Sequence, residues 1–317
     1  MFLLGNDFGC LLTAVGAYAC VLYFYKHFKS PLCLIWSVLF RKNVPLKERY
    51  GRWAVITGAS DGIGREYARN LARNGLDIVL ISRTESKLVQ LAKEIISQFG
   101  VDVKWITVDF SDGSEQVYDK IQSGLAGIEV GILVNNVGVV HENPAKFEEI
   151  PLKDIQQTVS VNICPSLRLT HMILPEMKRR RRGIIINVSS AAAFTGMAYI
   201  SVYGASKAFL NSITAALQLE LSGSGVECQL VTPIFVNTNM TQQWQSIDLW
   251  TLFSVGVERF TRMAVWTIGK VESTTGYWSH GLQLTILSSA PQWALETLIA
   301  FIMRLARRKV FRKQHLT

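Results

Sequence analysis

Tyr203 and Lys207 stand four residues apart in a segment of helical character, and Ser190 lies a short distance upstream. Residues four apart on a helix share one face, so the ammonium of Lys207 can lie beside the phenol of Tyr203. A free tyrosine has a pKa of about 10, and a nearby cation favours its ionised form. These side chains indicate proton exchange with a carbonyl or alcohol oxygen, with Tyr203 as general acid or base and Ser190 bonding the same oxygen.

Three glycines, Gly58, Gly62 and Gly64, follow the apolar residues 53–57 and precede an amphipathic segment. Because they lack side chains, they let the backbone turn tightly between a strand and a helix and approach a pyrophosphate at the helix N-terminus. A glycine triplet alone is a weak signal, but its place between a strand and a helix is the context that a nucleotide site requires.

The end of the next predicted strand distinguishes between two cofactors. A site for a bare ribose usually has a carboxylate there, whereas this chain has Ser82 and Arg83, which suit a 2′-phosphate. Asp109, after the third predicted strand, is placed to meet the adenine amine or, alternatively, to cap a helix. The sequence therefore favours NADP(H) over NAD(H).

Strands and helices alternate through the central part of the chain. We expect strands over residues 53–57, 77–81, 103–108, 131–134, 183–188 and 226–231, and helices over residues 63–74, 85–98, 152–177 and 202–221. Nearly continuous apolar strands alternating with helices predict an α/β fold with a doubly wound parallel sheet of Rossmann type and helices on both faces. We expect this domain over residues 50–280, an anchor and linker over 1–49, and an amphipathic helix with a basic tail over 281–317.

The composition limits the classes of protein to which the chain can belong. Its 317 residues, 49% of them hydrophobic, are enough to bury one large core. Five cysteines and five histidines show no metal-ligand spacing, so we expect reduced thiols and no metal. The net charge of +9 is concentrated in residues 178–182 and 304–313 rather than in a nucleic-acid-binding motif. We therefore expect no nucleic acid partner.

Both ends of the chain suggest contact with membrane lipid. Residues 8–25 form an apolar, uncharged run that is long enough to span a bilayer. A cleavable signal peptide is the alternative, but a basic n-region is missing and the apolar run continues past residues 17–19. The basic residues that follow place the large domain in the cytosol. Residues 30–40 are a second, shorter apolar stretch, and the C-terminal helix is expected on lipid headgroups or, alternatively, in solvent.

These motifs resemble those of the classical short-chain dehydrogenase/reductase family over about residues 50–280. TGxxxGxG corresponds to residues 57–64, NNxG to residues 135–138, and the catalytic tetrad to Asn162, Ser190, Tyr203 and Lys207. By this resemblance Asn162 supports a water-linked proton relay to Lys207, and Thr238 contacts the nicotinamide carboxamide. The expected cofactor-binding residues are then Gly58, Ser60, Asp61, Gly62, Ile63, Gly64, Ser82, Arg83, Asp109, Asn136, Gly138, Tyr203, Lys207, Pro233, Val236 and Thr238.

A narrower resemblance lies in residues 53–58, 80–83, 131–138 and 275–280. They look like the membrane-bound branch that holds 17β-hydroxysteroid dehydrogenases of types three and twelve, very-long-chain 3-oxoacyl-coenzyme A reductases and hydroxysteroid dehydrogenase-like proteins, and the last of these is the most similar. Vertebrate members of that last group are regarded as inactive for want of the catalytic tyrosine, which is present here as Tyr203. Ile234 after Pro233 departs from the Pro-Gly of many members, although the branch tolerates a bulky residue there.

The resemblance implies a membrane-associated, NADP(H)-dependent oxidoreductase that reduces a ketone, or oxidises the alcohol, on a steroid or a long 3-oxoacyl-coenzyme A. The alternative is a weakly active or inactive NADPH-binding scaffold of the membrane. The endoplasmic reticulum is the expected compartment, with the mitochondrion as the alternative. Relatives often pair through two long helices, which makes a homodimer possible.

Residues 239–275 follow the sixth predicted strand and are rich in bulky apolar side chains, so we expect them to cap an apolar substrate. Closing the core or forming a dimer contact is the alternative for any one of them. The side chains are Met240, Trp244, Leu249, Trp250, Phe253, Phe260, Met263 and Trp266.

Overall fold

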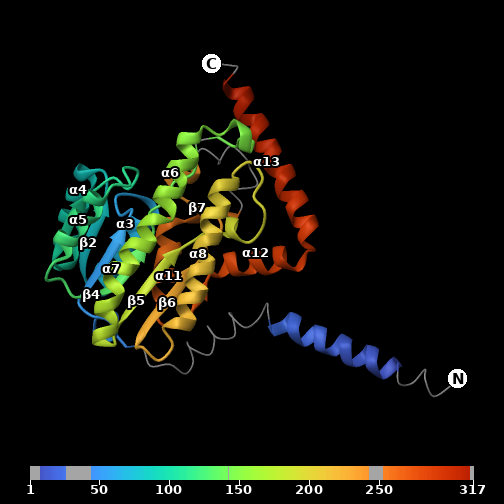
Figure 1. The fold of residues 1–317 in the computed structure, drawn as a ribbon, viewed down its shortest axis with the longest axis horizontal. Coiled ribbons are helices and arrows are strands. Elements are labelled where there is room, and N and C mark those ends of the chain that lie inside the picture. The colour runs from blue at the N-terminus through green and yellow to red at the C-terminus, as the bar shows by residue number, and fades with distance from the viewer. Residues whose placement is uncertain (1–7, 26–43, 142, 243–252, 315–317) are drawn as a thin grey trace. The chain divides into compact units, whose positions relative to one another are not determined.

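The computed structural model describes residues 8–25, 44–141, 143–242 and 253–314, and the chain divides into two compact units, Met1–Lys42 and Asn43–Thr317 (Figure 1). In the first unit, Phe8–Tyr25 is a fully exposed helix with a mean hydropathy of 1.7, long and apolar enough to cross a membrane. The apolar stretch predicted at residues 30–40 lies outside the described residues.

Within the described part of the second unit, seven parallel strands form one sheet in the order β3-β2-β1-β4-β5-β6-β9 (Figure 1). The chain order reverses direction between β1 and β4, which is the topology of a doubly wound sheet and confirms the predicted fold. The strands are β1 Trp53–Thr57, β2 Asp77–Ser82, β3 Val103–Thr107, β4 Val130–Asn135, β5 Gly183–Val188, β6 Val226–Val231 and β9 Ser273–Thr274. Two short strands, β7 Val236–Asn237 and β8 Val255–Gly256, pair separately.

Helices cover both faces of this sheet. The larger ones are α3 Gly62–Arg73, α4 Glu85–Phe99, α5 Glu115–Leu125, α6 Leu152–Asn162, α7 Cys164–Arg180, α8 Ser201–Glu220, α11 Val257–Trp266, α12 Trp278–Ser289 and α13 Gln292–Gln314. Successive strand residues point to opposite faces, so Ile56 of β1 packs in the cluster with α3, α4 and α11, whereas Val55 packs in the cluster with α5 and α7. Strands buried on both faces need the nearly continuous apolar sequence from which they were predicted.

The single long helix predicted for residues 152–177 is wrong, because the structure has two helices there. α6 ends at Asn162 and α7 begins at Cys164, with Ile163 between them at φ −109°. Pro165 has no backbone N–H and cannot donate to the carbonyl of Val161, so the helical hydrogen-bond ladder is interrupted at this point.

The second unit begins with a short helix, α2 Leu46–Tyr50, which is held at the amino ends of the strands. The guanidinium of Arg182, just before β5, donates to the carbonyls of Lys47 at 2.8 Å and Glu48 at 2.6 Å. Arg49 forms an ion pair of 2.6 Å with Glu227 of β6. These contacts fix α2 against the two strands whose opposite ends carry candidate site residues.

Candidate active site

The glycine loop between β1 and α3 has the backbone geometry that only glycine adopts readily. Gly58 and Gly62 have φ values of 64° and 53°, in the left-handed region. Gly64 is needed for a different reason, since a Cβ there would lie 2.3 Å from the carbonyl oxygen of Gly58. Asp61 caps α3 by accepting a hydrogen bond of 2.7 Å from the N–H of Gly62.

Thr57 and Asn136 tie this loop to the end of β4. The Thr57 hydroxyl donates to the carbonyl of Val134 at 3.2 Å and accepts from the N–H of Asn136 at 3.0 Å. The Asn136 amide donates to the carbonyls of Thr57 at 3.0 Å and Gly58 at 3.3 Å. The neighbouring strand therefore holds the loop in its tight turn.

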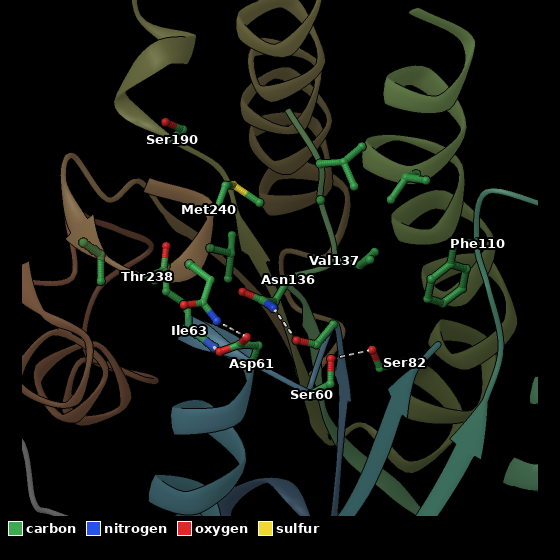
Figure 2. A pocket seen from close by; sticks show the side chains of 18 of the residues that line it. Ser60, Asp61, Ile63, Ser82, Phe110, Asn136, Val137, Ser190, Thr238 and Met240 are labelled. Atoms are coloured by element: carbon green, nitrogen blue, oxygen red, sulfur yellow. Dashed lines mark hydrogen bonds between the residues drawn. The ribbon is translucent and has the colours of Figure 1, made fainter. Parts of the chain in front are cut away.

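A cavity of about 280 Å³ lies at the carboxyl ends of the strands, beside this loop. Figure 2 shows Ser60 and Ser82 facing each other at one end and Ser190 with Met240 toward the other. The predicted site residues that line the cavity are Gly58, Ser60, Asp61, Gly62, Ile63, Ser82, Arg83, Asp109, Asn136, Gly138, Ser190, Tyr203, Lys207, Pro233, Val236 and Thr238. Of the residues predicted, Gly64 and Asn162 are the two that lie outside this lining.

Tyr203 and Ser190 come together in the cavity, although the electrostatics differ from the expectation. Burial raises the pKa of Tyr203, and the hydrogen bond with Ser190 only partly opposes this effect. The expected lowering of the Tyr203 pKa by a nearby cation is therefore wrong for this structure, because desolvation of the phenolate outweighs the stabilising contacts. The phenol accordingly holds its proton at neutral pH.

Lys207 is buried, with 4% of its surface exposed, and its Nζ lies 5.9 Å from the centroid of the Tyr203 ring. The ammonium donates to the carbonyl of Val188 at 3.0 Å, and burial lowers its pKa to about 8. A Cβ on Gly138 would lie 3.2 Å from Nζ, so the glycine there leaves room for the ammonium. Ser189 donates to the Lys207 carbonyl at 2.9 Å and fixes this part of α8.

Asn162 lies behind the cavity, with 1% of its surface exposed. Its amide oxygen accepts from the N–H of Val139 at 2.7 Å, and its amide nitrogen donates to the carbonyl of Val139 at 2.9 Å and the hydroxyl of Ser206 at 2.9 Å. The side chain therefore holds the segment after β4 against α8. A role in a proton relay stays a prediction.

At the other end of the cavity, hydroxyls and an exposed arginine surround the ends of β2 and β3. The hydroxyls of Ser60 and Ser82 lie 2.9 Å apart. Asp109 accepts from the N–H and hydroxyl of Ser111 at 2.9 and 2.8 Å. Burial opposes ionisation of Asp109, but these hydrogen bonds and the charge of Arg83 lower its pKa below the usual value. This end can hold a phosphate beside Arg83 and an amine beside Asp109, so the chain's residues fit a nicotinamide dinucleotide with a 2′-phosphate.

The loop after β6 closes the cavity opposite the glycine loop. A Cβ on Gly62 would lie 3.2 Å from the Thr238 methyl, so the two loops almost touch. Fully buried His280 supports this loop, since its Nδ1 accepts from the N–H of Ile234 at 3.5 Å and its Nε2 lies 3.2 Å from the carbonyl of Phe235. This role of His280 was not predicted from the sequence.

The apolar lining was largely missed by sequence reasoning. Phe110, Val139 and Val161 line the cavity from three different segments, and the available signal was only that Phe110 and Val139 follow strands closely. Of the expected cap, Met240 lines the cavity.

Other members of the expected cap lie elsewhere. Phe260 is fully buried in the core with α3, so it follows the alternative of closing the core, whereas Phe253 and Trp266 are 40% and 37% exposed. Trp244, Leu249 and Trp250 lie outside the described residues.

Comparison with known proteins yields consistent matches. A family model described as short chain dehydrogenase matches residues 52–248. The chain is 39% identical to a very-long-chain 3-oxoacyl-CoA reductase of Rattus norvegicus over 82% of each chain. It is 35% identical to the inactive hydroxysteroid dehydrogenase-like protein 1 of Homo sapiens over 89% of this chain and 86% of the relative. A short-chain dehydrogenase from Sphingobium yanoikuyae in complex with NADPH has a TM-score of 0.65 at 27% identity, covering 76% of this chain and 97% of the other.

Proposed function

Because the chain belongs to the short-chain dehydrogenase/reductase family, we propose that it uses NADP(H) to reduce a ketone on a bulky, lipid-like substrate or to oxidise the corresponding alcohol. The observation that carries this proposal is the meeting of Ser190, Tyr203 and Lys207 in one cavity with the glycine loop. When bound, the cofactor supplies or accepts the hydride at its nicotinamide ring.

The chain's own residues account for the proton and the developing charge. The raised pKa of Tyr203 keeps its phenol protonated, which is the form that a general acid needs to donate to a ketone oxygen. Ser190 donates a hydrogen bond to the same oxygen as negative charge develops on it. Lys207, with a pKa of about 8, is positively charged in most molecules at neutral pH and favours the tyrosinate left after proton transfer.

A preference for NADP(H) is supported by the polar end of the cavity. Ser82 and Arg83 stand where a site selective for the bare ribose usually has a carboxylate, and a guanidinium binds a phosphate by charge-assisted hydrogen bonds. The NADPH complex of the Sphingobium yanoikuyae relative is consistent with this choice.

A long-chain 3-oxoacyl-coenzyme A is the substrate to test first, followed by a ketosteroid. Relatives at 39–40% identity are very-long-chain 3-oxoacyl-CoA reductases, and apolar side chains such as Val139, Ile234 and Met240 line the same cavity as Ser190 and Tyr203. The helix Phe8–Tyr25 supports an anchor in a membrane, which we place in the endoplasmic reticulum with the catalytic unit in the cytosol, the mitochondrion being the alternative. Sizing of the purified protein distinguishes a homodimer from a monomer.

The decisive experiment compares Tyr203→Phe with the wild-type protein for consumption of NADPH with both substrates. Removal of the phenolic proton donor is expected to lower turnover by at least about a hundredfold while NADPH binding persists. Tyr199→Phe is the matched control, because Tyr199 is a nearby tyrosine outside the cavity lining, and its turnover is expected to stay normal.

Equal turnover in Tyr203→Phe and wild type would overturn the assignment of the proton donor. NADPH binding by the wild type without turnover of any ketone in the panel would instead favour the scaffold alternative.

A further inference from the structure

Helices α12 and α13 expose an apolar surface that the proposed catalytic site does not use. The two helices meet at a bend of 117° and lie at one side of the catalytic unit, away from α4 (Figure 1). Their outward side chains recur at spacings of three or four residues, which places them on one face of each helix. This outer face consists of Trp278, Leu282 and Ile286 on α12, and Leu298, Phe301 and Leu305 on α13, each between 42% and 66% exposed.

The opposite face of α13 packs against the rest of the catalytic unit between Glu296 and Arg307. Met303 is 1% exposed and packs in a cluster with Ile200 and Tyr203. Near the start of α13, Glu296 accepts a hydrogen bond of 3.2 Å from Thr195, and farther along Arg307 forms an ion pair of 2.7 Å with Glu149. A helix fixed in this way is placed to lie along a surface, with one face on the protein and the other outward.

The charge pattern of this helix pair fits an anionic lipid surface. Glu296 is the single acidic residue between positions 278 and 314, and its carboxylate is turned toward Thr195. Arg308 and Lys309 are exposed one turn beyond Leu305, and Arg304 lies in the preceding turn. A second copy of the chain on the same face would bring these cations close together, which disfavours a symmetric dimer there.

We propose that α12 and α13 form a membrane-docking surface that binds anionic lipid headgroups and lies in the bilayer interface, in addition to the helix Phe8–Tyr25. The apolar outer face enters the acyl boundary, and the cations at the end of α13 contact the headgroups. The consequence for catalysis rests on the proposed function. Because α13 packs against the segment that carries Tyr203, docking places this proton donor close to the bilayer, in which a lipid-like ketone dissolves.

The test uses the full chain in phosphatidylcholine vesicles with about 30% phosphatidylserine, without substrate or cofactor. A fluorescent amino acid is encoded at position 301 in place of Phe301, and quenching by doxyl-labelled lipid is compared with quenching by aqueous iodide. The matched control carries the same probe in place of Ile96, which is 46% exposed on α4 at the far side of the unit (Figure 1). We expect lipid quenching at position 301 and iodide quenching at position 96.

Charge dependence gives a second measurement. Arg308→Gln is expected to shift the docking equilibrium about fivefold toward the undocked state, since one cation near an anionic surface contributes about that factor. Replacing phosphatidylserine by phosphatidylcholine is expected to act in the same direction. Iodide quenching at position 301 equal to that at position 96 would overturn the proposal. Protection of position 301 from both quenchers, together with cross-linked dimers, would also overturn it in favour of a second copy.

Turnover separates this inference from the proposed function. Phe301→Glu is expected to lower turnover of a long-chain ketone dissolved in vesicles by about tenfold or more, while turnover of a water-soluble short-chain ketone and NADPH binding stay unchanged. Ile96→Glu is expected to change neither. Lipid quenching at position 301 without any ketone reduction would support the docking surface and refute the proposed activity. Ketone reduction together with iodide quenching at position 301 would support the proposed activity and refute the docking surface.

Discussion

Gly64→Ala offers a test in which two physical effects predict opposite signs. An alanine in place of a helical glycine usually stabilises a protein by about 1 kcal/mol, because glycine is the poorer helix former. At Gly64, however, the new Cβ would lie 2.3 Å from the Gly58 oxygen and 2.5 Å from the Asn136 amide nitrogen. Since real Cβ atoms essentially never come within 3.0 Å of such atoms, the glycine loop must move by about 0.7 Å or the start of α3 must tilt.

The expected magnitude follows from the contacts at risk. Overpacking of this kind costs about 1–3 kcal/mol, and each hydrogen bond from Asn136 to Thr57 or Gly58 contributes about 1 kcal/mol. After the gain in helix propensity, Gly64→Ala is expected to lose about 1–2 kcal/mol of unfolding free energy. The loop that receives the pyrophosphate is displaced as well, so the dissociation constant for NADPH is expected to rise at least about tenfold.

Thermal unfolding in detergent and titration of NADPH fluorescence measure the two effects. Gly281→Ala in α12 is the matched control, because its Cβ would meet only Thr275, at an ordinary distance of 3.4 Å. That variant is expected to be as stable as wild type or more so, with unchanged NADPH binding. If Gly64→Ala behaved like the control, the reasoning from the close approach of Gly58 and Gly64 would be refuted.

Three other expectations concern charge and support of the site. Because burial lowers the pKa of Lys207 from 10.5 to about 8, the unfolded chain holds this proton more tightly, and wild type should gain stability relative to Lys207→Met as pH rises from 8 to 10.5, by at most about 3 kcal/mol. A pH series of urea unfolding checks this, and a constant difference would contradict it. His280→Phe should lose about 1–3 kcal/mol in the same assay, because the N–H of Ile234 loses its contact with Nδ1 and the carbonyl of Phe235 keeps only the N–H of Val255; full stability would contradict the assigned contacts. Arg83→Ala should weaken NADPH binding about tenfold and leave NADH binding unchanged, and an equal loss for both would remove the 2′-phosphate assignment.

The sheet was predictable because its strands are apolar runs with clear limits. The strands at residues 53–57, 183–188 and 226–231 begin and end as predicted; the first two are almost entirely apolar, as a strand buried on both faces requires, whereas the third also contains Glu227 and Gln229. α5 was not predicted, because its apolar residues are few and interrupted by polar ones. The break before α7 had a visible signal in Pro165, which the regular apolar pattern on either side obscured.

The polar half of the site was predictable and the electrostatics were not. Glycines, hydroxyls and the Tyr203–Lys207 spacing are local patterns that a sequence displays directly. The pKa of Tyr203 depends on burial by segments distant in the chain, and the ammonium of Lys207 bonds the carbonyl of Val188 in another element. Such contacts between distant residues, like those of His280, follow from tertiary packing and leave no local pattern.

The contacts of Arg182 and Glu227 with α2 determine where a force on the chain would act. Arg182, by hydrogen bonds, and Glu227, by an ion pair, hold this helix at the amino ends of β5 and β6. Ser190 and the glycine loop lie at the carboxyl ends of parallel strands. Strands of five or six residues separate these edges by about 17–20 Å. A pull transmitted along the backbone from residue 44 would therefore act first on this ion pair and on the hydrogen bonds of Arg182 at the amino ends of the strands, and the site residues at the carboxyl ends would keep their positions.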